Sequence, residues 1–112
     1  MQSLYAKADE LCDLLDGELD ASRRAGCQLA ENEAQYRQAL RVAILAEREA
    51  GTPVTVIGDV CRGDSEIADL KRARDCAEAL YKASCEAINV HKLRLRMVNA
   101  EIERTWHSNN TR

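Results

Sequence analysis

The fold is decided by residues 64–107, DSEIADLKRARDCAEALYKASCEAINVHKLRLRMVNAEIERTWH. Apolar and small residues recur here in steps of three and four, which is typical of a long helix that packs one side against another helix. The row consists of Ile67, Leu70, Ala77, Tyr81, Ser84, Ile88, His91, Leu95, Val98 and Ile102, with Arg74 as its one bulky charge. The pattern predicts a helix over 64–107, capped by Asp64 or Ser65 and followed by a frayed polar tail at 108–112.

A second long helix is predicted upstream, over residues 3–50. Its row shows the same mixed spacing and consists of Leu4, Ala8, Leu11, Leu15, Leu19, Ser22, Ala25, Leu29, Tyr36, Leu40, Ala43 and Ile44. Gly17 and Gly26 lie inside this segment, where glycine weakens a helix. Two interpretations stay open: the helix kinks or breaks at a glycine, or a neighbouring helix approaches closely at Gly26.

The connector is residues 51–63, GTPVTVIGDVCRG. Gly51 is suited to end the first helix, and Thr52 and Pro53 are suited to cap and begin a short helix. The β-branched run that starts at Val54 allows an extended conformation instead. Because the connector is short, the two long helices are expected to lie antiparallel, which predicts an all-α helical hairpin.

Composition narrows the class of protein. A chain of 112 residues predicts one domain, 1–112. It has no uncharged apolar run long enough to span a membrane and no signal-like start, so we expect a cytoplasmic protein without a membrane partner. No catalytic motif is present, and neither His91 nor His107 is followed by a second ligand three or four residues later. We therefore expect no enzyme activity, no cofactor and no metal.

Cysteine usage points to reduced thiols. The five cysteines are an odd number, and none forms a C-x-x-C pair. Most of them fall within the helical patterns, where a reduced cysteine is expected to pack as a small apolar residue.

Several large apolar residues fall outside both rows, which points to self-association. They are Leu14, Val42 and Leu45 in the first helix and Leu80, Val90, Leu93 and Met97 in the second. An isolated hairpin would leave these side chains in water, so the sequence predicts a homo-oligomer that assembles as a helical bundle.

Charge is distributed unevenly along the chain, whose net charge is -3. Residues 1–35 contain three basic and eight acidic residues, a balance of -5, whereas residues 82–112 contain six basic and three acidic residues, a balance of +3. The helix-spaced set Asp9, Asp13, Asp16 and Asp20 is read either as a solvated surface or as an acidic face that binds a host nucleoprotein complex.

The basic residues of the second helix form the other candidate site. Lys92, Arg94, Arg96 and Arg104 would contact the phosphates of single-stranded DNA without reading its sequence. The alternative is ordinary surface charge, paired with carboxylates of the first helix.

A family resemblance bears on this choice. Residues 51–106, which include GTPVTVIGDVCRGD and LKRARDCAEALYKASCEAINVHKLRLRMVNAEIERTW, resemble small helical proteins of phages and prophages of Gram-positive bacteria. More distantly, Ala87-Ile88 followed by Lys92, Arg94 and Arg96 resembles the UvsY-type phage recombination mediators. That resemblance implies an all-helical protein that self-associates into rings, binds single-stranded DNA and loads a strand-exchange protein.

The leading functional prediction is a non-enzymatic, oligomeric, phage-type accessory protein of DNA recombination. A protein of this kind would bind single-stranded DNA or a recombination protein. Two alternatives stay open: an inhibitor or adaptor of anti-defence type that acts through the acidic face, and a structural coiled-coil assembly factor.

Overall fold

The chain folds into three helices. A computed structural model describes residues 2–110, in which α1 spans Gln2–Glu49, α2 spans Val54–Gly63 and α3 spans Ser65–Asn110. No strand occurs within these residues. Helices α1 and α3 pack against each other as a hairpin, so the predicted all-α hairpin is confirmed.

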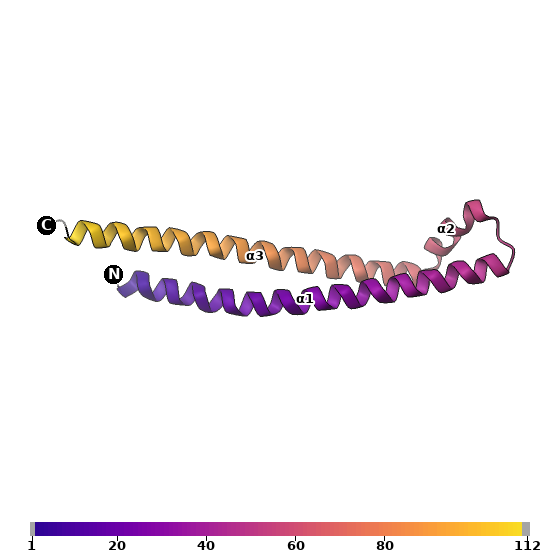
Figure 1. The fold of residues 1–112 in the computed structure, drawn as a ribbon, viewed down its shortest axis with the longest axis horizontal. Coiled ribbons are helices and arrows are strands. Elements are labelled where there is room, and N and C mark those ends of the chain that lie inside the picture. The colour runs from indigo at the N-terminus through magenta and orange to yellow at the C-terminus, as the bar shows by residue number, and fades with distance from the viewer. Residues whose placement is uncertain (1, 111–112) are drawn as a thin grey trace. The chain divides into compact units, whose positions relative to one another are not determined.

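Contacts between residues divide the chain into two compact units. The first unit combines residues 1–24 with residues 82–112, and the second unit comprises residues 25–81. Within each unit, a stretch of α1 lies beside a stretch of α3, as Figure 1 shows. The start of α1 meets the end of α3 in the first unit, and the end of α1 meets the start of α3 in the second. The two helices are therefore antiparallel.

The rows predicted from the sequence form the cores of both units. In the first unit, Leu11 and Ile88 are buried. The buried residues of the second unit are Tyr36, Ile57, Cys61, Ile67 and Ala77. Every residue of the row predicted for α3 is buried or half-buried, as the 3–4 spacing requires.

The row predicted for α1 is correct except at one position. Leu19 is 52% exposed, and the half-buried residue at this turn is Glu18. Glu18 lies three residues after Leu15 and four before Ser22, so it fits the helical spacing that Leu19 interrupts. A carboxylate occupies this position because it meets a polar partner, His91, on α3.

Neither glycine breaks α1, which is one helix from Gln2 to Glu49. A Cβ added at Gly26 would lie 3.3 Å from Cε1 of Tyr81, whereas one added at Gly17 would meet nothing within 4 Å. The close approach expected at Gly26 is therefore confirmed, and the expectation of a kink or break is wrong. Gly26 provides the space that the Tyr81 ring occupies.

The end of α1 is closed by backbone hydrogen bonds. The N–H of Gly51 donates to the carbonyl of Arg48 at 3.2 Å, and the N–H of Thr52 donates to the carbonyl of Glu47 at 3.1 Å. Gly51 has a φ of +85°, which residues with a Cβ rarely adopt. This pair of bonds is the Schellman motif, and the predicted role of Gly51 is confirmed.

The connector contains the short helix α2 rather than an extended segment. Its predicted start is shifted by one residue, because Pro53 is the N-cap and makes no side-chain capping bond. The hydroxyl of Thr52 does not cap α2; it donates to the Glu47 carboxylate at 2.6 Å.

The start of α3 is capped by Asp64 and not by Ser65. Oδ2 of Asp64 accepts hydrogen bonds from the N–H groups of Glu66 and Ile67 at 3.1 and 3.2 Å. At the other end, the prediction of a frayed tail is wrong for residues 108–110, which continue the helix. No glycine or proline interrupts them. Residues 111 and 112 lie outside the described residues.

The expectation that the cysteines pack as small apolar residues holds for only part of the set. Cys61 is buried, with 2% of its surface exposed, and Cys85 is half-buried with its Sγ 3.8 Å from the hydroxyl of Ser22. Cys12, Cys27 and Cys76 are exposed, so the prediction is wrong for these three. None of them lies in the row through which its helix meets the other.

Candidate interaction surfaces

Three of the four predicted nucleic-acid-binding residues are exposed cations without a carboxylate partner in the described part of the chain. These residues are Lys92, Arg94 and Arg96. The fourth, Arg104, is exposed but forms an ion pair with Glu101 one turn earlier on α3. Most other arginines pair with acidic residues on their own helix, but Lys7, Arg41 and Arg48 are likewise exposed without a carboxylate partner in the described residues.

The three unpaired cations do not share one side of α3. Successive residues of a helix are rotated by about 100°. Lys92 and Arg96 therefore lie one turn apart on the same side, and Arg94 points to the other side. The structure thus brings two of the predicted residues together and separates the third.

The predicted acidic face of α1 is exposed along its whole length. Asp9, Asp13 and Asp16 make no ion pair within the described residues. Asp20 contacts Arg23 at 2.7 Å and Arg24 at 3.6 Å. The hydrogen bond from Arg23 and the charge of Arg24 lower the pKa of the Asp20 carboxyl. The face is therefore acidic over its first three members and neutralised at its last.

Exposed apolar side chains form the most extensive surface of the chain. All seven residues predicted to lie outside the rows are exposed. Val90, Leu93 and Met97 are 39%, 55% and 64% exposed, and their spacing places them on one side of α3. Trp106 is also exposed, with 57% of its surface accessible. These side chains are available to a partner.

The predicted seam of α3 contains one polar contact that the sequence did not indicate. Ile88 is buried, while Tyr81, His91, Leu95, Val98 and Ile102 are half-buried. Nδ1 of His91 lies 2.8 Å from a carboxylate oxygen of Glu18 on α1. His91 is therefore an interface residue within the hairpin, as expected from its place in the row. Its partner could have been found only by assigning Glu18 to the row of α1.

Arg74 occupies its place in the row through a second polar contact. Its guanidinium donates to the carboxylate of Glu33 at 2.8 Å and lies 5.0 Å from the centre of the Tyr36 ring. Hydrogen bonds from Arg37 and then from Arg74 lower the pKa of Glu33. The hydrogen bond to Glu33 raises the pKa of Arg74. Arg74 thus remains charged within the interface because an anion and an aromatic face surround it.

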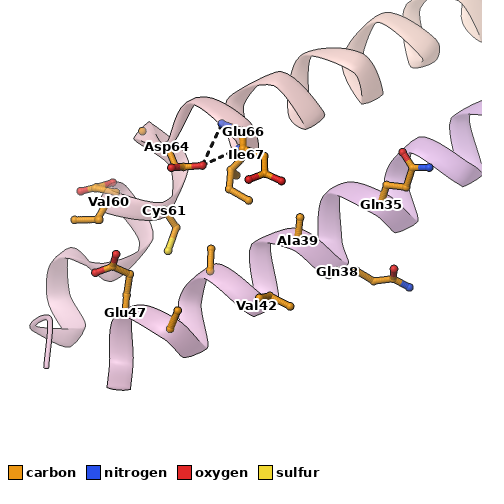
Figure 2. Close-up of a pocket in the computed structure, with 14 residues that line it drawn as sticks. Gln35, Gln38, Ala39, Val42, Glu47, Val60, Cys61, Asp64, Glu66 and Ile67 are labelled. Atoms are coloured by element: carbon orange, nitrogen blue, oxygen red, sulfur yellow. Dashed lines mark hydrogen bonds between the residues drawn. The ribbon is translucent and has the colours of Figure 1, made fainter. Parts of the chain in front are cut away.

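A groove of about 880 Å³ lies where α1, α2 and α3 meet in the second unit. Figure 2 shows Cys61 of α2 and Ile67 of α3 pointing toward α1. The remaining apolar part of its wall comes from Ala39, Val42, Ala43, Ala46 and Val60. Its carboxylates are Glu47, Asp59, Asp64 and Glu66, and no lysine or arginine of the described chain lines it. We call this feature the acidic groove; no pattern in the sequence indicates it.

Comparison of the chain with protein-family models, with curated proteins and with solved structures finds no match. In residues 2–110, no helix is both long and apolar enough to cross a membrane. The same residues contain no group of three or more His, Cys, Asp or Glu side chains that could hold a metal ion. The surfaces described above are therefore the basis for a functional proposal.

Proposed function

We propose that the chain is a non-enzymatic helical assembly protein whose copies associate through their exposed apolar side chains. The observation that carries this proposal is the exposure of Val90, Leu93 and Met97 on one side of α3. Single exposed apolar residues are normal, whereas a helical row of them is typical of an interaction surface.

The estimated free energy of burying these side chains is large enough to allow association. Full burial of one such side chain contributes about 1.5–3 kcal/mol. Three of them from each of two copies would contribute on the order of 5–10 kcal/mol after allowance for partial exposure, against an association cost of about 4–15 kcal/mol. The two quantities are comparable, so we expect association that depends on protein concentration.

Concentration dependence of thermal unfolding tests this function. If copies bind one another only when folded, the midpoint of unfolding rises with protein concentration. The double variant Leu93→Gln, Met97→Gln should lose most of that dependence. Val54→Gln, Val56→Gln is the matched control, since it removes exposed apolar side chains from α2, and should retain it. A wild-type midpoint that is independent of concentration would refute the proposal.

Binding of single-stranded DNA, as an accessory protein of recombination, is a second candidate function. It is favoured by the exposed and unpaired cations Lys92, Arg94 and Arg96. Such cations would bind phosphates electrostatically, so affinity should fall steeply with salt concentration. The absence of binding to an oligonucleotide at about 50 mM salt, where phosphate contacts are strong, would exclude this function.

Two variants with the same charge change show whether the predicted site is responsible for binding. Lys92→Glu, Arg96→Glu reverses two neighbouring cations of α3 and should weaken DNA binding. Arg41→Glu, Arg72→Glu reverses two exposed cations elsewhere and should weaken it less. Equal losses would show that net charge, and not this site, governs binding.

A further inference from the structure

We propose that the acidic groove of one copy binds the exposed row Val90, Leu93 and Met97 on α3 of a second copy. This inference rests on the proposed self-association and specifies the two surfaces that meet. It concerns a contact between unlike surfaces, because the groove and the row belong to different parts of the chain.

The shape of the row fits a groove. Val90, Leu93 and Met97 stand at positions i, i+3 and i+7 of α3, and these are the anchor positions that helices use when they bind in apolar grooves. All three are exposed, and Met97 also lines a shallow cavity beside Leu14 of α1. The groove offers aliphatic side chains such as Val42, Val60 and Ile67 for the anchors to contact.

The charges of the two surfaces are complementary. Arg94 and Arg96 lie on either side of the row, and neither has a carboxylate partner within the described residues. The wall of the groove has four carboxylates and no lysine or arginine in the described chain, although Asp59 pairs with Arg62 at 2.8 Å. Among these carboxylates, that of Glu66 has no side-chain partner. Docking the row would bring both arginines to the carboxylates, which gives the contact its orientation.

The contact has a consequence for symmetry. A contact between unlike surfaces leaves one groove and one row free after two copies bind. Further copies therefore add until a ring closes or a chain of subunits forms. The mass is expected to increase beyond that of a dimer as concentration rises.

Exchange of charges between the two surfaces tests the contact. The groove variant is Asp59→Lys, Glu66→Lys, and the row variant is Arg94→Glu, Arg96→Glu. Each variant alone opposes like charges, so its self-association should weaken by on the order of tenfold or more. In an equimolar mixture, every acidic surface can meet a basic one, and association should return. Sedimentation velocity measures each sample and the mixture.

Control variants separate the contact from net charge. Asp9→Lys, Asp16→Lys matches the groove variant, and Arg41→Glu, Arg72→Glu matches the row variant. Both controls lie outside the groove and the row and should associate as the wild type does. Circular dichroism checks that each variant is helical. If a charge-reversed variant unfolds, a neutral variant takes its place. The neutral groove variant is Asp59→Asn, Glu66→Gln, and the neutral row variant is Arg94→Gln, Arg96→Gln. Each should also weaken association.

The outcomes distinguish this contact from the proposed function. A wild-type chain that stays monomeric overturns both. A wild-type chain that associates, with variants that associate equally well or a mixture that does not recover, overturns the contact alone. A row variant that loses DNA binding without any change in mass overturns it too, and assigns the arginines to nucleic acid.

Discussion

At the scale of single residues, the two glycines of α1 differ in what surrounds them. Gly17 is exposed with open space around it, whereas Gly26 faces the ring of Tyr81. Replacing Gly17 with Leu should raise the free energy of unfolding by about 0.5–1 kcal/mol, because glycine weakens a helix. The same change at Gly26 should lower it by about 1–3 kcal/mol, because the side chain would overlap the ring.

Urea unfolding, followed by circular dichroism at one protein concentration, measures both changes. The comparison uses the same substitution in the same helix, so the opposite signs report only the surroundings. Stabilisation at both positions would contradict the close contact between Gly26 and Tyr81.

The lowered pKa of Glu33 predicts a dependence of stability on pH. The carboxyl accepts hydrogen bonds from Arg37 and Arg74, so its pKa is lower in the folded chain than the usual value of about 4.5. The stabilisation is therefore complete above that usual value and is lost as the pH falls through the lowered folded value. Glu33→Gln should destabilise the chain at neutral pH and have little effect in strong acid.

Urea unfolding of the wild type and of Glu33→Gln across the acidic range measures this difference. Glu31→Gln is the control, since that carboxylate lies on the same helix and contacts Gln35 but no cation. A difference between wild type and Glu33→Gln that is the same at every pH would show that the carboxylate acts without its charge.

The sequence predicted most residues of the rows, and failed where a polar side chain occupies an apolar position. Hydrophobicity alone assigns Leu19, and not Glu18, to the row of α1. The contact that reverses the choice is made by His91, far away in the sequence. Glu33, which accepts a hydrogen bond from Arg74, presents the same problem. Such pairs can be recognised only once the register of the two helices is known.

At the scale of elements, the start of α3 depends on one capping residue. Asp64 accepts two backbone hydrogen bonds in the first turn, whereas Ser65 is the first residue of the helix. Asp64→Ala should lower the free energy of unfolding by about 1 kcal/mol, the usual contribution of an N-cap. Ser65→Ala should have little effect. Urea unfolding measures both, and equal losses would show that the capping bonds do not matter.

The existence of the elements was predictable, but the details of the connector were not. Gly51 and Asp64 carry strong local signals, since each acts on backbone groups within a few residues. The sequence left α2 open because β-branched residues suit either a helix or an extended segment. The structure resolves this choice, because α2 is a helix that buries Ile57 and Cys61, four residues apart, on one side.

At the scale of the whole molecule, both functional candidates depend on what the chain leaves exposed. In the proposed contact, the apolar row of α3 on one copy meets the acidic groove of another. The groove could not have been predicted from the sequence, because its wall combines residues of three helices. The cations of α3 were predicted as one site, but their angular spread divides them between two sides of the helix.

If copies of this chain associate, the molar mass in solution must increase with protein concentration. Sedimentation equilibrium from low to high micromolar protein should give an average mass that rises with concentration above the 12.5 kDa of one chain. The rise should be lost in the variant Leu93→Gln, Met97→Gln. A mass that stays at 12.5 kDa over the whole concentration range would show that copies of the chain do not associate.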